Sequence, residues 1–171
     1  PYNDYRVIAG QSTSAQELIK EMPDLDIIIT PIGGGGLISG TALAVKHFAP
    51  KMEVIGSEPE GSASAFLSNA NNKLMQVNHP DTICDGLRAS IGEKNFAIIN
   101  ELVNDVFRVS DQQALAAMKL VWERMKIVIE PSCAVPLAAI LANRNRFSGS
   151  RIGVILTGGN IDLESLSEML K

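Results

Sequence analysis

An apolar run at residues 27–32, Ile-Ile-Ile-Thr-Pro-Ile, is followed by four glycines at 33–36 and then by Leu-Ile-Ser-Gly-Thr-Ala-Leu-Ala-Val at 37–45. This pattern predicts a buried strand, a turn of bare backbone and the start of a helix. Glycine has no Cβ atom to keep an anion at a distance, and the first N–H groups of a helix have no partner within it. The stretch therefore predicts a phosphate-binding turn.

Other interpretations of the glycine run must be weighed against this one. An ATP- or GTP-binding loop requires a lysine after its glycines, and residues 37–39 supply none. A dinucleotide-binding turn requires G-x-G-x-x-G and a later acidic residue; Gly34, Gly36 and Glu58 match, but Ser39 stands at the third glycine position. A tight turn without a ligand rarely needs so many consecutive glycines. The dinucleotide site stays as the alternative.

A second glycine turn follows an apolar run near the C-terminus. Residues 152–156, Ile-Gly-Val-Ile-Leu, predict a buried strand that leads into Thr-Gly-Gly-Asn at 157–160, and Asp162 is expected to cap a last helix. Ligands of an open α/β sheet bind at the carboxyl ends of its strands, so we expect the two turns to face one crevice.

The remaining pattern alternates between strands and helices. Strands are expected at residues 7–9, 27–32, 52–57, 106–109 and 152–156, and helices from Thr13 or Ser14 to Pro23, from 37 to Ala49, and at 62–69, 96–103, 111–125 (capped by Ser110) and 134–141. Strands separated by helices of this length imply an α/β fold, a parallel sheet with helices on both faces.

Composition narrows the class of protein. The chain has 171 residues, of which 46% are hydrophobic, so one domain with a buried core is expected. A net charge of −4 without a basic cluster argues against nucleic acid and anionic membrane surfaces as partners. Cys84 and Cys133 form no metal or redox pattern, so we expect buried thiols in a reducing, cytoplasmic compartment.

Four blocks in this chain occur together in one known family. They are Pro-Ile-Gly-Gly-Gly-Gly-Leu at 31–37, Thr-Ile-Cys-Asp-Gly-Leu at 82–87, Leu-Val-Trp-Glu-Arg-Met-Lys at 120–126 with Ile-Glu-Pro at 129–131, and Leu-Thr-Gly-Gly-Asn-Ile-Asp at 156–162. In this order they resemble the serine racemase and serine/threonine dehydratase family, whose members are fold type II pyridoxal-phosphate enzymes. The blocks span nearly the whole chain.

The resemblance implies pyridoxal 5′-phosphate as the cofactor. In the family the glycine turn binds its phosphate through backbone N–H groups, and a hydroxyl, here that of Thr157, meets the pyridine nitrogen. A hydroxyl cannot hold that nitrogen protonated as a carboxylate would, so the ring is a weaker electron sink, which suits rapid β-elimination or brief carbanions. The implied cofactor-binding residues are Gly33, Gly34, Gly35, Gly36, Leu37, Asp85, Gly86, Glu130 and Thr157.

Several of these residues also have an interpretation that involves no cofactor. Thr157 could be an ordinary strand-end hydroxyl that bonds to a loop N–H. Asp85 and Gly86 line the cofactor ring by analogy with the family, or simply form a turn. Glu130 lies beside the cofactor, or pairs at the surface before Pro131.

Part of the family pattern is missing. The Schiff-base lysine of the family stands in a Ser-x-Lys-x-Arg-Gly type segment, and nothing here resembles it. The small domain with its loop for the substrate carboxylate is absent too, while residues 1–4 resemble the point where the family chain returns to the large domain. We therefore interpret residues 1–171 as the C-terminal portion of the large domain. The resemblance implies that this half has no catalytic residue of its own; we expect it to be inactive alone and to need the N-terminal half of an enzyme that is a homodimer when complete.

A divalent cation is a further implication of the resemblance. Many family members bind Mg²⁺, Mn²⁺ or Ca²⁺ through a glutamate, a carbonyl four residues later and an acidic residue two after that. These positions correspond to Glu58, the carbonyl of Ser62, and Ser64. Serine in the last position removes an anionic ligand that such cations prefer, so a loop without a metal is the alternative.

The sequence leaves three functions open for this chain, and the third is not enzymatic. The first is an ammonia-lyase or racemase: serine, threonine or 3-hydroxyaspartate would lose its β-hydroxyl after Cα deprotonation, giving an enamine that hydrolyses to a keto acid and ammonia, or would be reprotonated on the other face. The second is a dinucleotide-binding domain. The third is a fragment that only scaffolds a dimer interface.

Overall fold

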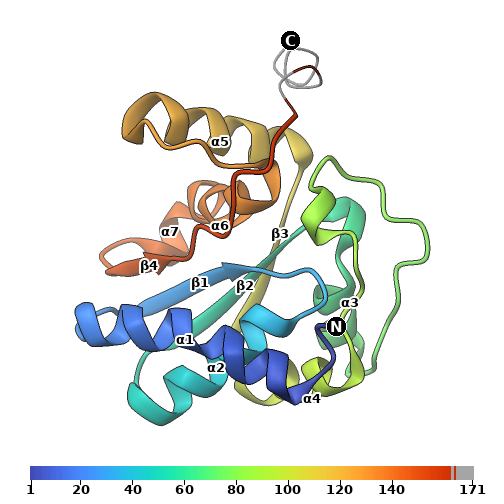
Figure 1. Cartoon of the computed structure of the whole chain (residues 1–171), viewed down its shortest axis with the longest axis vertical. Helices are drawn as coiled ribbons and strands as arrows, with labels where there is room; N and C mark the ends of the chain where they lie inside the picture. The colour runs from blue at the N-terminus through green and yellow to red at the C-terminus, as the bar shows by residue number, and fades with distance from the viewer. Residues whose placement is uncertain (163, 165–171) are drawn as a thin grey trace.

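The computed structural model describes residues 1–162 and 164 and contains one parallel sheet (Figure 1). The strands are β1 (Ile27–Pro31), β2 (Glu53–Pro59), β3 (Asp105–Val109) and β4 (Ile152–Val154), in the spatial order β3-β2-β1-β4. Ile27 of β1 lies opposite Glu53 on one side and Ile152 on the other. The carboxyl ends of all four strands therefore lie at one edge, as the sequence predicts for an α/β fold.

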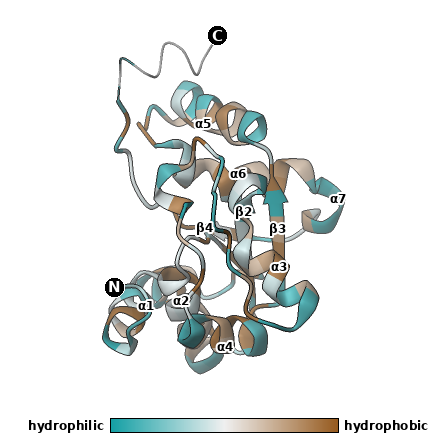
Figure 2. Cartoon of the chain, turned by 90° about the vertical axis from the view of Figure 1, so that its right-hand side faces the viewer, coloured by the Kyte–Doolittle hydropathy of each residue, from teal (hydrophilic) through white to brown (hydrophobic). Residues whose placement is uncertain are grey.

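Helices cover both faces of this sheet. They are α1 (Tyr5–Glu21), α2 (Gly36–Phe48), α3 (Ser64–Asn71), α4 (Glu93–Leu102), α5 (Asp111–Met125), α6 (Pro131–Ala142) and α7 (Arg144–Phe147), with short 3₁₀ turns at Glu60–Ser62 and Asp85–Leu87. Figure 2 shows the strands between α5 and α6 on one side and α1, α2 and α4 on the other. The predicted arrangement is confirmed.

The buried strand β1 explains why residues 27–31 form an unbroken apolar run. Ile27 and Ile29 pack with α5 and α6 in one core, whereas Ile28 packs with α1, α2 and α4 in the second. Every residue of β1 is buried because a central parallel strand has helices on both faces.

The N-terminal prediction is wrong. Residues 7–9 are not a strand but lie within α1, which begins at Tyr5 after Asp4 caps it by accepting the N–H of Arg6. Ile8, Ala15 and Ile19 are buried on one side of this helix. A three-residue apolar run carries too little periodicity to distinguish strand from helix, and the helical spacing becomes visible only over the full 17 residues.

The hydroxyls of Thr13 and Ser14, the residues at which the first helix is expected to begin, instead lie in the middle of α1. They donate to the carbonyls of Gly10 and Gln11, three residues back along the helix. This local bonding is the usual way for a hydroxyl to be accommodated inside a helix.

Other local predictions hold. Ser110 and Gln113 form a reciprocal capping box at the start of α5, with an Oε1···N distance of 2.8 Å and an Oγ···N distance of 3.2 Å. Cys84 and Cys133 are free and buried. The strand expected at 152–156 is shorter, since β4 ends at Val154.

The predicted last helix falls on residues 163 and 165–171, which lie outside the described residues. At its expected start, the carboxylate of Asp162 accepts the N–H of Glu164, as a capping residue would. Within the described residues, no helix has both the length and the apolar character needed to cross a bilayer.

Helices α1 and α2 touch at a glycine. A Cβ on Gly40 would lie 2.5 Å from the carbonyl oxygen of Ile8 and 2.6 Å from the nitrogen of Ser12, so two backbones meet there without a side chain between them. Gly10, on the exposed side of α1, has no atom within 4 Å of the same position.

This contrast predicts opposite effects of the same substitution on the free energy of unfolding. Gly40→Ala should lower it by about 1–3 kcal/mol, because the added methyl group forces α1 away from α2. Gly10→Ala should raise it by about 0.5–1 kcal/mol, because alanine loses less backbone entropy in a helix. Urea denaturation of both variants measures the difference; a Gly40→Ala variant as stable as the wild type would contradict this packing.

Candidate functional site

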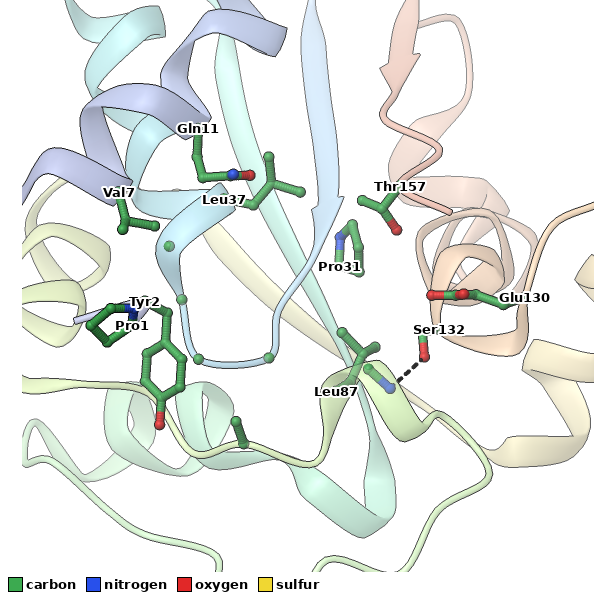
Figure 3. Close-up of a pocket in the computed structure, with 16 residues that line it drawn as sticks. Pro1, Tyr2, Val7, Gln11, Pro31, Leu37, Leu87, Glu130, Ser132 and Thr157 are labelled. Carbon is green, nitrogen blue, oxygen red and sulfur yellow. Dashed lines mark hydrogen bonds between the residues drawn. The ribbon is translucent and has the colours of Figure 1, made fainter. Parts of the chain in front are cut away.

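The glycine turn lies between β1 and α2 (Figure 3). Gly35 is the N-cap of α2 with φ of 93°, a left-handed conformation that favours glycine. No side chain caps this helix, and no acidic residue stands in its first turn. Its first N–H groups and the positive end of its dipole are thus free of side-chain competition, which is what an anion requires.

The turn opens on a pocket of about 450 Å³. Residues 33–37 form one wall, and the opposite wall carries Glu130, Ser132 and Thr157 (Figure 3). Because Thr157, three residues after the end of β4, and the residues after β1 line the same space, the expectation that the two turns face one crevice is confirmed.

The floor of the pocket is held by the 3₁₀ turn Asp85–Leu87. The N–H of Gly86 donates to Ser132 Oγ at 3.1 Å and to the carboxylate of Asp85 at 2.9 Å. A Cβ on Gly33 would lie 2.9 Å from the carbonyl oxygen of Gly86, so floor and glycine turn are in close contact. Gly86 lines the pocket, whereas the exposed Asp85 faces a neighbouring hollow formed with Asp111.

The wall opposite the glycine turn is built by the start of α6. The N–H of Glu130 donates to the carbonyl of Gly158, and its carboxylate accepts the N–H of Asn160 at 2.8 Å. The N–H of Thr157 donates to Cys133 Sγ at 3.1 Å. These contacts leave the Thr157 hydroxyl directed into the space between Pro31 and Glu130 (Figure 3). Glu130 therefore faces the pocket; among the described residues it forms no ion pair at the surface.

The predicted cation ligands are already engaged by the protein. Glu58 is fully buried, and its two carboxylate oxygens accept the N–H groups of Ala65 and Phe66, each at 2.9 Å. Burial raises the pKa of Glu58 to about 7. Ser62 Oγ donates to the carbonyl of Leu87, and Ser64 Oγ accepts the N–H of Ile91.

These residues as they stand do not form an open set of cation ligands. The part of the chain that the structure describes holds no group of three or more His, Cys, Asp or Glu residues placed to bind a metal. Because Glu58 is buried and faces α3, it is also not placed to meet a ribose hydroxyl, which removes the acidic residue that the dinucleotide alternative requires.

None of the lysines in the described residues lines this pocket. All of these lysines are exposed except the half-buried Lys94, whose Nζ donates to the carbonyl of Asn3.

Several residues near the site were missed in the sequence. Tyr2, Gln11 and Ser132 line the pocket, and the buried Asn95 bonds to the glycine turn from behind. A signal for Asn95 was available, because it stands four residues from the apolar, buried Ile91 on one side and Ile99 on the other. A polar side chain on a buried helix face needs a bonding partner and so marks a structured polar site.

The chain belongs to the pyridoxal-phosphate dependent enzyme family, whose model matches residues 1–158. Over 97% of its length it is 45% identical to a β-hydroxyaspartate dehydratase of Paracoccus denitrificans and covers 53% of that protein. It is 43% identical over its full length to a serine racemase of Arabidopsis thaliana, again covering 53%. The structure superposes on the processed form of threonine deaminase isoform 2 from Solanum lycopersicum with a TM-score of 0.93, at 33% identity, covering 98% of this chain and 47% of that one. The chain thus spans about half the length of these relatives.

The geometry of the turn predicts the outcome of one charge substitution. Gly35→Asp should weaken binding of inorganic phosphate at least about tenfold, because the new carboxylate places a like charge beside the anion and a Cβ there would lie 2.7 Å from that of Asn95. Gly149→Asp is the matched control, since Gly149 also has a positive φ of 81° but no atom within 4 Å. Calorimetric titration with phosphate should give unchanged affinity for that variant; equal affinities for both variants would contradict the assignment.

Proposed function

We propose that residues 1–171 form the cofactor-binding half of a pyridoxal-phosphate dependent lyase or racemase that acts on a small hydroxy amino acid such as serine, threonine or 3-hydroxyaspartate. Membership of the family supports the cofactor. Similarity to a serine racemase, a β-hydroxyaspartate dehydratase and a threonine deaminase supports the substrate class. The observation that carries the proposal is the bare-backbone turn at the N-terminus of α2, directly across one pocket from Thr157.

The residues present fit a phosphorylated cofactor. The first two positions of the turn have no room for a side chain: a Cβ on Gly33 would meet the Gly86 carbonyl at 2.9 Å, and one on Gly34 would overlap the ring of Tyr2. What the turn can present to a ligand is therefore its backbone N–H groups. We assign the phosphate to the N–H groups of residues 33–37, where the dipole of α2 adds to their attraction.

Thr157 would act on the opposite end of the cofactor. When bound, pyridoxal phosphate supplies an electron sink that stabilises negative charge at the Cα atom of an amino acid. A neutral hydroxyl at the ring nitrogen leaves that sink weak, which suits fast loss of a β-hydroxyl or return of the proton to Cα. The N–H of Asn160 holds the Glu130 carboxylate in the same wall. Gly86 would border the ring from below, while Asp85, which faces the neighbouring hollow, would act only by accepting the N–H of Gly86.

The finer assignments are proposals as well. The free, buried thiols of Cys84 and Cys133 support a reducing compartment, which we take to be the cytoplasm. The family resemblance supports a homodimer for the complete enzyme. A divalent cation at Glu58, the Ser62 carbonyl and Ser64 requires Glu58 to release the N–H groups of α3; calorimetric titration with Mg²⁺, with Glu58→Gln as the control, tests it.

Thr157→Ala tests the assignment of the ring partner. In the complete enzyme we expect turnover to fall at least about tenfold, because the ring nitrogen loses its hydrogen-bond partner, while the affinity for the cofactor changes less because the phosphate stays anchored. Thr157→Ser retains the hydroxyl and should keep most of the activity. Steady-state kinetics and cofactor titration by visible absorbance separate the two effects. A Thr157→Ala variant with unchanged turnover, or one whose turnover is fully restored by saturating cofactor, would contradict this role.

We further propose that the lysine that carries the cofactor comes from a segment outside these residues. Residues 1–171 alone, mixed with pyridoxal phosphate and reduced with borohydride, should show no stoichiometric label on any one lysine by peptide mass spectrometry and form no pyruvate from serine. Addition of an N-terminal half from a relative should restore both. A single, fully labelled lysine within this chain, together with pyruvate formation, would overturn the proposal.

A further inference from the structure

Asn95 is a fully buried amide on α4, beside the glycine turn. Burial of an amide is unfavourable unless its polar atoms find partners. Both of its polar atoms do: Oδ1 accepts the hydroxyl of Ser39 at 3.1 Å, and Nδ2 donates to the carbonyls of Gly34 at 2.9 Å and Tyr2 at 3.1 Å. One side chain thus joins the glycine turn, the first turns of α2 and the N-terminal segment.

The bond to Gly34 fixes a peptide plane within the turn. The Gly34 carbonyl accepts the N–H of Gly92 at 3.3 Å as well as the amide of Asn95, so two donors hold it on the side of α4. A trans peptide is planar, and its carbonyl and N–H point in opposite directions. Holding this carbonyl therefore directs the N–H of Gly35 away from α4.

The other two bonds fix the surroundings of the same peptide. Ser39 belongs to α2, so its hydroxyl sets the distance between that helix and Asn95. The carbonyl of Tyr2 is held by Asn95, and the ring of Tyr2 occupies the space that a Cβ on Gly34 would need. The carbonyl of Gly34 is therefore enclosed on the α4 side, and its peptide has little freedom to rotate.

We propose that Asn95, oriented by Ser39, is a positioning residue of the glycine turn. It holds the Gly34 carbonyl on the side of α4, so that the N–H groups of the turn converge on a phosphate dianion. It does not contact the ligand itself. This inference rests on the proposed function of the turn. In the absence of the amide, the Gly34 peptide can rotate and present its carbonyl oxygen, a repulsive dipole, to the anion.

Asn95→Leu is the direct test, since leucine has nearly the same size and cannot donate. We expect the dissociation constant for inorganic phosphate, measured by calorimetry, to rise about 10- to 100-fold in protein that circular dichroism shows to be folded. Asn100→Ala is the matched control on the same helix: Asn100 is exposed, bonds only to Asn72 among the described residues, and should leave the dissociation constant unchanged.

Ser39→Ala provides a second, milder variant if Asn95→Leu does not fold. It removes the hydroxyl that orients the amide and should weaken phosphate binding about 2- to 10-fold. The double variant should bind no more weakly than Asn95→Leu alone, because both substitutions act through one bond. A purely structural role for Asn95 would instead lower the melting temperature and leave the phosphate affinity of the folded protein intact.

The outcomes separate this inference from the one on which it rests. If the wild-type chain binds neither phosphate nor pyridoxal phosphate, the proposed function fails, and the role of Asn95 fails with it. If the wild type binds and the folded Asn95 and Ser39 variants bind equally well, only the role of Asn95 is overturned. Loss of affinity in both variants, with Asn100→Ala unchanged, supports it.

Discussion

The backbone of Gly33, Gly34 and Gly35 is enclosed so tightly that none of the three positions has room for a side chain. The Gly86 carbonyl, the ring of Tyr2 and the Cβ atom of Asn95 occupy the space where their Cβ atoms would lie. An enclosed turn of this kind has only its backbone to present on its open side. The shape of the turn therefore depends on contacts with segments near residues 2, 86 and 95, which are far apart in the sequence.

The strand order of the sheet places the glycine turn and Thr157 on two sides of the same pocket. Strands β1 and β4 are neighbours, with Ile29 opposite Val154, although more than a hundred residues separate them in the chain. Both run in the same direction, so the glycine turn after β1 and Thr157 after β4 emerge at one edge. In the proposed assignment, a cofactor held at both ends by this edge would have its phosphate on a helix N-terminus and its ring beside a neutral hydroxyl.

The sequence correctly predicted the elements whose signal lies within a few neighbouring residues. The apolar run before four glycines predicted β1 and the start of α2, and the Ser110–Gln113 capping box placed the start of α5, because each signal lies within a few residues. The strand assigned to residues 7–9 was wrong because the pattern of α1 becomes clear only over its whole length. The direction of the Glu58 carboxylate and the bonds of Asn95 depend on tertiary contacts, which a single sequence does not show.

A crystal structure of the chain soaked with pyridoxal phosphate tests the central claim most directly. The account predicts the phosphate within hydrogen-bonding distance of the N–H groups of residues 33–37, with the ring nitrogen facing the hydroxyl of Thr157. A phosphate bound elsewhere on the molecule, with the glycine turn empty at saturating cofactor, would contradict it.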